Sequence, residues 1–259
     1  PRPMPTLAPP TATSILPSPT PQGRPLLVPR AADSGPGTLR QAMLDAQNGD
    51  TITFDPAIFP PNAPVTIFIA NELPWITQGN LTVDASNAGV VLDGSSATGE
   101  WPGLQIVSSH ANTIRGMQIT NFSGPGIAMA GDAQYNIIGG DRSLGSGPFG
   151  QGNLLSNNDN GISLATPGTG LNTITGNLIG TDAESADALG NRNGVVISEG
   201  AYLNTIGPNN IIAYNRENGI FVSDTQTVRN TITQNSIHDH GWFGISLWKS
   251  GYTEIAFPK

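Results

Sequence analysis

The stretch that decides the fold reads NTIGPNNIIAYNRENGIFV at residues 204–222 and returns as NTITQNSIHDHGWFGISL at residues 230–247. Each copy contains Asn-Thr-Ile, then Asn-x-Ile, then a polar turn and a Gly-Ile pair, and the two Gly-Ile pairs lie 25 residues apart. Earlier copies begin at residues 112 and 172. A fixed period within the range of roughly 20–50 residues predicts a solenoid, a propeller or a repeat array.

Each copy holds three short apolar runs in which inward and outward positions alternate. In the last copy Ile232, Ile237, Ile245 and Leu247 are predicted to point inward, and Ser246 outward. This period of two, in runs of about three to five residues, predicts strands rather than helices. Asn and Gly between the runs allow the left-handed backbone angles of sharp turns. Three strands and three corners per copy predict one coil of a right-handed parallel β-helix.

Stacked coils would place the inward Ile, Val and Leu in one continuous core. Asn at matching corners of successive coils would stack into a hydrogen-bonded ladder. A propeller is the competing prediction, but its blades need four longer antiparallel strands joined by tight hairpins. The sequence shows no such hairpins and therefore favours the solenoid.

Two spacings are longer than the basic period, since Gly126 to Gly161 is 35 residues and Gly161 to Gly194 is 33. The extra residues are predicted to leave the coil as loops, at residues 140–150 and 181–190. In repeat proteins such insertions often gather on one face, and that face is often the binding face. The loops supply four candidate ligand-binding residues, which are Asp141, Arg142, Asp182 and Asp187.

The N-terminal region is rich in Pro, Thr and Ser, a composition typical of an extended linker. A first strand is predicted at residues 26–28, and Thr38 is predicted to cap a helix at residues 39–47. This helix would form a lid, because an open solenoid end exposes core and unpaired strand edges. The predicted organisation is a tail at residues 1–29 and a β-helix at residues 30–259, with a helical cap at about 37–47 and regular coils at about 104–250.

Several motifs carry a resemblance to a known group of proteins. They are ADSGPGTLRQA at residues 32–42, GDTITF at 49–54, GNLIGTD at 176–182 and ALGN at 188–191. With these motifs the chain resembles bacterial exported β-helix repeat proteins over roughly residues 26–250. The resemblance implies a pectate-lyase-like right-handed parallel β-helix on a secreted or surface protein. It implies little about activity, since this architecture includes polysaccharide lyases, hydrolases and epimerases as well as adhesins and inert stalks.

The composition argues against several function classes. The chain has 259 residues, no Cys, a formal net charge of −8 and only 11 Lys and Arg. Nucleic-acid binding needs clustered Lys and Arg, and disulfide, zinc-finger or thiol chemistry needs Cys. No apolar run approaches the roughly 18–20 residues of a membrane span. Because the chain starts at Pro1 without a signal peptide, we expect a mature or excised fragment. The resemblance implies a location outside the cell or at its surface.

No residue pattern predicts a catalytic pair. Glycoside hydrolysis generally uses two carboxylates that face each other, whereas most candidate Asp and Glu of this chain sit at corners or in loops, where Asp forms turns, and none forms a paired pattern. The best local candidate is His238-Asp239-His240 beside Trp242, which is suited to binding a metal or to acid–base work on a stacked sugar. We favour a corner loop equivalent to residues 157–161, with both His in water, because no third metal ligand is visible.

Three functions stay open at this point. The leading hypothesis is a non-catalytic extracellular stalk or filament subunit, with the Pro-rich tail as a tether or intersubunit strap. The alternatives are a polysaccharide-active lyase, hydrolase or epimerase, and a carbohydrate-binding adhesin. No cofactor is predicted, and calcium is the alternative if the chain is a lyase. Matching open ends would repeat into a filament, and the candidate assembly residues are Leu26, Leu27, Trp248, Tyr252 and Phe257.

Overall fold

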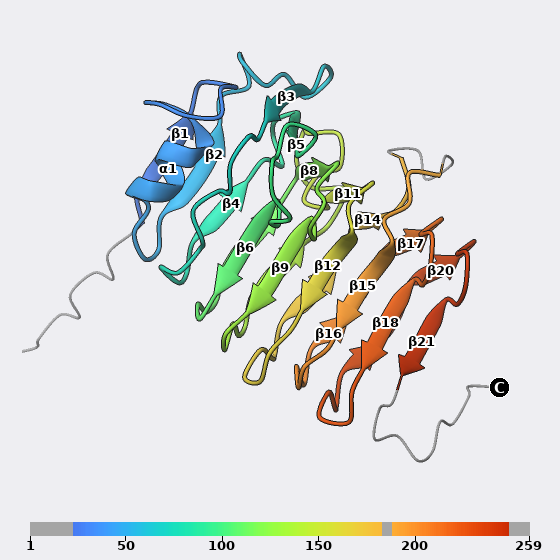
Figure 1. Cartoon of the computed structure of the whole chain (residues 1–259). Coiled ribbons are helices and arrows are strands. Elements are labelled where there is room, and N and C mark those ends of the chain that lie inside the picture. The colour runs from blue at the N-terminus through green and yellow to red at the C-terminus, as the bar shows by residue number, and fades with distance from the viewer. Residues whose placement is uncertain (1–22, 183–187, 249–259) are drawn as a thin grey trace, which may run out of the picture.

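The computed structural model describes residues 23–182 and 188–248 (Figure 1). Its strands form three sheets of eight, seven and six strands. Along the chain the strands enter the three sheets in turn, and each strand pairs in parallel with its counterpart one coil away. The prediction of an all-β parallel β-helix is therefore confirmed. The propeller prediction is excluded, because propeller blades are built from antiparallel strands.

From β4 onward each coil contributes one strand to each sheet, and the earlier strands β1, β2 and β3 belong to the first two sheets. The first sheet consists of β1 (Pro25–Val28), β2 (Thr51–Phe54), β4 (Thr82–Asp84), β7 (Thr113–Arg115), β10 (Ile137–Gly139), β13 (Thr173–Thr175), β16 (Thr205–Ile206) and β19 (Thr231–Ile232). The second consists of β3 (Val65–Phe68), β5 (Val90–Asp93), β8 (Met117–Thr120), β11 (Leu154–Ser156), β14 (Leu178–Ile179), β17 (Ile211–Ala213) and β20 (Ser236–His238). The third consists of β6 (Leu104–Val107), β9 (Ile127–Ala130), β12 (Asn160–Leu164), β15 (Asn193–Ile197), β18 (Ile220–Ser223) and β21 (Ile245–Trp248).

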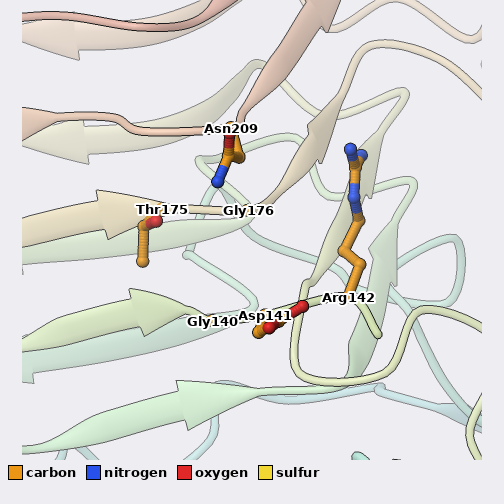
Figure 2. Close-up of a pocket in the computed structure, with 6 residues that line it drawn as sticks. All are labelled: Gly140, Asp141, Arg142, Thr175, Gly176 and Asn209. Atoms are coloured by element: carbon orange, nitrogen blue, oxygen red, sulfur yellow. The ribbon is translucent and has the colours of Figure 1, made fainter. Parts of the chain in front are cut away.

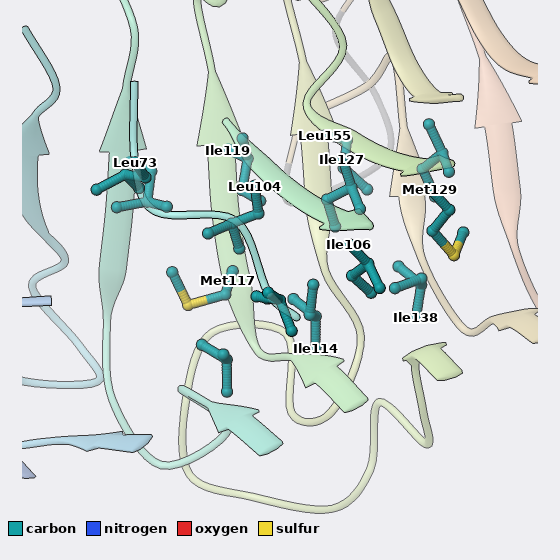
Figure 3. Close-up of a cluster of buried hydrophobic side chains, with 14 of the residues drawn as sticks. Leu73, Leu104, Ile106, Ile114, Met117, Ile119, Ile127, Met129, Ile138 and Leu155 are labelled. Carbon is teal, nitrogen blue, oxygen red and sulfur yellow. The ribbon is translucent and has the colours of Figure 1, made fainter. Parts of the chain in front are cut away.

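The core is a set of inward rows that run from coil to coil, and Figure 3 shows the part around Ile114 and Ile138. In the first sheet the inward row continues through Ile174 and Ile206, each 0% exposed. The strand alternation that the sequence predicts is therefore confirmed. In the last described coil Ile232 is only partly buried, because no described coil covers it.

The helix α1 (Leu39–Asp45) forms the predicted lid over the first coil, beside β1 and β2 (Figure 1). The Thr38 hydroxyl accepts a hydrogen bond from the Gln41 N–H at 3.3 Å, which satisfies one free donor of the first turn. The buried side chains of α1 pack into the core. Because β1 pairs with β2, the solenoid begins within the segment assigned to the tail. Residues 1–22 of that tail lie outside the described residues.

Three ladders of buried Asn connect the coils at the three corners, as the sequence predicts. The ladder before the first sheet contains Asn112, Asn136, Asn172, Asn204 and Asn230. The ladder between the first and second sheets contains Asn153, Asn177, Asn210 and Asn235. The ladder between the second and third sheets contains Asn158, Asn191 and Asn215.

Asn172 shows why these amides tolerate burial. Its oxygen accepts from both the backbone and the side-chain N–H of Asn136, each at 2.9 Å. Its side-chain nitrogen donates to the Asn204 oxygen and to the Ala133 carbonyl, both at 2.9 Å. All donor and acceptor positions of the amide are thus occupied, and the bonds reach one coil in each direction.

We predict that Asn172→Ala destabilises the protein by about 2–3 kcal/mol, because it leaves buried N–H groups of Asn136 without an acceptor. Urea unfolding followed by circular dichroism measures the change. The matched control is Thr173→Ala at the next position, where the side chain is partly exposed. If the two variants lose equal stability, the ladder does not stabilise the fold as we describe.

Candidate functional site

The first candidate site is a surface hollow of about 420 Å³ where the chain passes from the first to the second sheet (Figure 2). Its lining residues are Gly140, Asp141, Arg142, Thr175, Gly176 and Asn209. The structure thus brings two of the four predicted ligand-binding residues, Asp141 and Arg142, to one hollow. Figure 2 shows their side chains pointing away from each other, so they act there as separate groups.

Asp141 is already occupied by its own turn. Its Oδ1 accepts from the Ser143 hydroxyl at 2.7 Å and from the Ser143 N–H at 2.8 Å, and these bonds hold the pKa of the Asp141 carboxyl below its ordinary value. Among the described residues, Arg142 has no carboxylate partner. This hollow therefore offers one cation and a fixed carboxylate, without a proton donor of raised pKa.

The loop that carries Asp141 and Arg142 is tied to the outside of the solenoid. Phe149 is 6% exposed and packs on outward side chains of three strands of the second sheet, Leu154, Leu178 and Ile211. The Gly147 N–H donates to the Ser86 carbonyl at 2.7 Å, two coils earlier. The loop therefore spans and braces neighbouring coils, and we call residues 140–152 the strap.

The second insertion leaves the coil after β14. Thr181 forms an antiparallel bridge with Ala188, and the Thr181 hydroxyl donates to the Asp182 Oδ1 at 3.4 Å. Asp187 lies outside the described residues. Leu189 then accepts from the Asn157 N–H at 2.8 Å, at the passage from the second to the third sheet. The first insertion thus precedes a strand of the second sheet, and the described ends of the second insertion follow one, at the opposite end of the strands.

The predicted trio at residues 238–240 is divided between outside and inside. His238 Nδ1 lies 2.8 Å from the Asp239 Oδ2, and both side chains are partly exposed. The His238 ring meets the Tyr214 ring edge-on. Within the described residues, no group of three or more His, Asp or Glu is placed to hold a metal ion. His238 and Asp239 therefore form an isolated surface pair.

His240 corrects the prediction that both His lie outside in water. Its Nδ1 accepts the Asn215 N–H at 3.2 Å, so it occupies the next position of the third Asn ladder. Alternation fails here because corner residues do not follow the strand period of two. Burial, with a contribution from His238, lowers the pKa of His240 below its ordinary value of 6.5. The prediction of a corner equivalent to residues 157–161 is confirmed, since Asn158 belongs to the same ladder.

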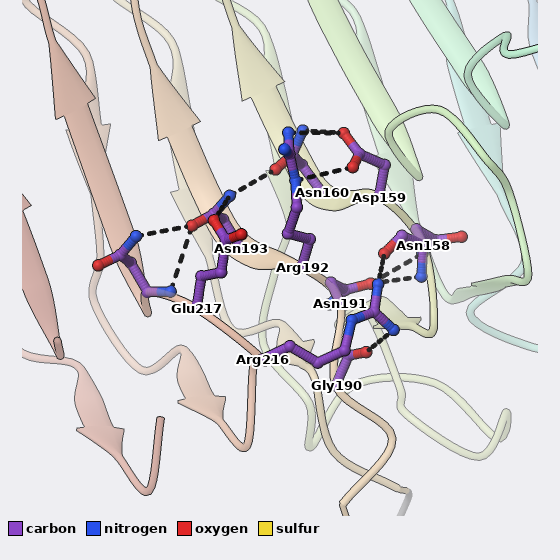
Figure 4. Close-up of polar contacts among 10 residues, drawn as sticks. Asn158, Asp159, Asn160, Gly190, Asn191, Arg192, Asn193, Arg216 and Glu217 are labelled. Carbon is purple, nitrogen blue, oxygen red and sulfur yellow. Dashed lines mark hydrogen bonds and ion pairs between the residues drawn. The ribbon is translucent and has the colours of Figure 1, made fainter. Parts of the chain in front are cut away.

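The second candidate site is a hollow of about 480 Å³ at the passage from the second to the third sheet. Its lining includes Ser95, Asn121, Ser123, Asn157, Asp159 and Arg216. Beside it, Asp159 forms an ion pair with Arg192 of the next coil at 2.9 Å (Figure 4). From the sequence, Asp159, Arg192 and Arg216 are expected only as isolated charged residues, and none of them is assigned to a site.

The row beside the second hollow was visible in the sequence as a repeat position. The Arg192 N–H donates to the Asp159 carbonyl, the Glu217 N–H to the Arg192 carbonyl and the Trp242 N–H to the Glu217 carbonyl, at 2.7–2.8 Å. These four residues are separated by 33, 25 and 25 positions. Aligning the coils across the second insertion would have found the row, and it includes the predicted candidate Trp242, which is 64% exposed.

The other acidic groups with shifted pKa values are used in local structure. Hydrogen bonds from Arg24 and neighbouring N–H groups outweigh the effect of burial and lower the pKa of Asp50 to about 2. Burial raises the pKa of Asp84, but hydrogen bonds from Arg115 and Ser86 outweigh it and the net shift is downward. Burial also raises the pKa of Asp224, but hydrogen bonds from the Thr227 hydroxyl and nearby N–H groups outweigh this effect, and the net shift is downward.

The described assembly candidates lie at opposite ends of the solenoid. In β1, Leu26 packs partly against the core and Leu27 is 54% exposed. At the end of β21, Trp248 is 59% exposed. Tyr252 and Phe257 lie outside the described residues. The exposed side chains at the later end therefore include Trp242, Trp248 and Ile245.

Comparison with known proteins gives a family match over the later coils. Residues 172–257 match the model of a family described as a right handed beta helix region. No curated protein matches the chain. Within the described residues, no helix has the length and apolar character needed to cross a membrane. The family match supports the right-handed β-helix fold and does not specify an activity.

We predict that the free energy of unfolding decreases as the pH falls below about 6.5, because the unfolded chain then protonates His240 while the folded chain resists it. The maximal slope from this one group is about 1.4 kcal/mol per pH unit. His240→Asn restores a ladder amide and is expected to remove this slope. Urea unfolding at several pH values measures it, with exposed His110→Asn as the control.

An unchanged slope in His240→Asn would contradict the assignment of His240 to the ladder. A reduced slope in His110→Asn of the same size would show that the loss is not specific to the ladder position.

We also predict that Phe149→Ala releases the strap and raises the rate of trypsin cleavage after Arg142 by tenfold or more, because the strap loses its packing on Leu154, Leu178 and Ile211. Mass spectrometry of timed digests measures the rate at this bond. Leu144→Ala is the control within the same loop, since Leu144 is 51% exposed. Equal cleavage rates in the two variants would rule out Phe149 as the anchor.

Proposed function

We propose that this chain is a non-catalytic structural β-solenoid that serves as a stalk or filament subunit outside the cell or at its surface. The observation that carries the proposal is that its buried and bridging polar groups connect coils to one another. Asn172 joins three coils, the Arg115–Asp84 pair joins two at 2.6 Å, and Arg192–Asp159 does the same. These contacts stabilise the stack of coils, and the polar groups that form them are bonded to other coils.

The state of the carboxyl groups supports a non-catalytic role. Among the described residues, every acidic group with a shifted pKa is shifted downward: Asp50, Asp84, Asp141 and Asp224. A general acid in glycoside hydrolysis requires a carboxyl group whose pKa is raised by its surroundings. The hydrolase alternative is therefore less well supported than the structural one.

The strap also bears on the adhesin alternative, which assigns ligand binding to the two insertion loops. Phe149 holds the strap against the second sheet, and the Gly116 N–H donates to its Gly152 carbonyl at 3.1 Å. These contacts favour a bracing role for the first insertion. The described ends of the second insertion lie at another corner, at the passage from the second to the third sheet.

The two described ends differ, and this difference favours a stalk over a head-to-tail filament. At the first coil, α1 covers the core. At the last described coil, Ile245 and Phe243 are 46% and 63% exposed, and no described strand lies beyond β21. Head-to-tail growth requires complementary ends. In this proposal residues 1–22 act as the tether.

We predict no turnover of polysaccharides. The full chain is incubated with neutral and uronic-acid polysaccharides, with and without calcium, and reducing ends and unsaturated products are assayed. A catalytic amount of either product would overturn the non-catalytic assignment. Negative-stain microscopy of the full chain and of a chain starting at Gly23 tests assembly, and this truncation preserves β1.

We expect single particles from both chains. Filaments that disappear on truncation would instead make the tail an intersubunit strap.

A further inference from the structure

The hollow at the passage from the second to the third sheet has the properties of a binding site. Its volume of about 480 Å³ lies within the usual range for ligand sites, about 300–1,000 Å³. The side chains around it come from four different coils, through Ser95, Asn121, Asn157 and Arg216. The coil that contains β14 contributes no described residue to the lining, and Arg216 reaches back to the Gly190 carbonyl of that coil (Figure 4).

The polar groups of this hollow are held in place. Arg216 donates to the Gly190 carbonyl at 3.0 Å and to the Asn158 carbonyl at 3.4 Å (Figure 4). These bonds turn its guanidinium back along the solenoid axis, over two earlier coils. A guanidinium has five N–H donors, and these two bonds leave the others for a ligand.

Another part of the lining is a relay of amides. The Asn157 side chain donates to the Asn121 oxygen, and the Asn121 side chain donates to the Asp93 carboxylate at 2.9 Å. The relay leaves the Asn157 oxygen as an acceptor and further amide N–H groups as donors. Groups that are already ordered lose little conformational entropy when a ligand binds.

The charges of the hollow nearly cancel. Asp159 forms an ion pair with Arg192 at 2.9 Å, and the cation Arg216 is balanced by Asp93, whose carboxylate accepts from the lining residue Asn121. A strongly anionic ligand would meet these carboxylates, and the protein as a whole carries a net charge of −8. The lining therefore suits a neutral ligand whose groups both donate and accept hydrogen bonds, and sugar hydroxyls have this property.

An apolar contact continues the same surface. Trp242 occupies the row of Asp159, Arg192 and Glu217, three coil steps from Asp159, or roughly 14 Å at the usual strand spacing. Its side chain is 64% exposed. The apolar face of an exposed indole can pack on the C–H face of a sugar ring. A ligand that reaches both the hollow and Trp242 needs several linked rings.

We infer that the hollow lined by Asn121, Asn157 and Arg216 binds a neutral oligosaccharide, which extends along the solenoid axis toward Trp242. This site is separate from the strap and from the His238–Asp239 pair. It adds a ligand to the structural role and requires no catalysis.

Isothermal titration calorimetry of the full chain tests the inference with cellohexaose, maltohexaose, mannohexaose and chitohexaose as neutral probes, and hexagalacturonate as the acidic one. We expect saturable binding of at least one neutral hexasaccharide. Ser95→Trp is expected to weaken it tenfold or more by filling the hollow, because the Ser95 side chain makes no hydrogen bond to another described residue. Arg216→Ala is expected to act similarly and Trp242→Ala less.

Arg142→Ala is the matched control, since it removes an Arg from the other hollow and should leave the affinity unchanged. Circular dichroism confirms that each variant is folded. The inference is overturned if no neutral hexasaccharide binds, if only hexagalacturonate binds, or if Ser95→Trp binds as tightly as the unmodified chain.

Discussion

The structure depends on one requirement, that every polar position of a buried side-chain amide must find a partner. In a stack of coils an Asn meets this requirement only when the coils before and after it present the same corner. Asn177 takes its partners from Asn153 on one side and Asn210 on the other. A single coil cannot satisfy such a residue, so the corners make the stack cooperative and fix the register that the apolar rows alone would leave less defined.

The fold can be predicted well from the sequence because local residue patterns determine each coil. The strands, the capped helix after Thr38 and the Asn ladders follow from alternation, turn residues and a repeated spacing, each of which needs only neighbouring residues or a fixed period. The end of the helix is less accurate, since Ala46 leaves the helical angles while its side chain stays in the core.

The candidate sites are less predictable for the opposite reason. Arg192 and Glu217 belong to one surface row only when coils of different length are aligned correctly, and the insertions hide that alignment. Strand alternation, extended through a corner, predicts that His240 lies in water. At this corner the His240 side chain instead turns inward and continues a ladder. Strap packing also depends on Phe149 reaching three strands, a contact that no spacing in the sequence encodes.

The ladders have a direction, and this direction has a consequence for how such a chain can change in length. Within the corner ladders the bonds from one Asn side chain to the next point toward the later coil, as from Asn136 to Asn172 and from Asn172 to Asn204. A second row, Asn160, Asn193 and Asn218, donates toward the earlier coil. These hydrogen-bonded rows of Asn stay continuous when one complete coil is duplicated or removed. They are interrupted when only part of a coil is duplicated or removed. Such a chain can therefore lengthen or shorten by whole coils, whatever the length of the loops that each coil carries.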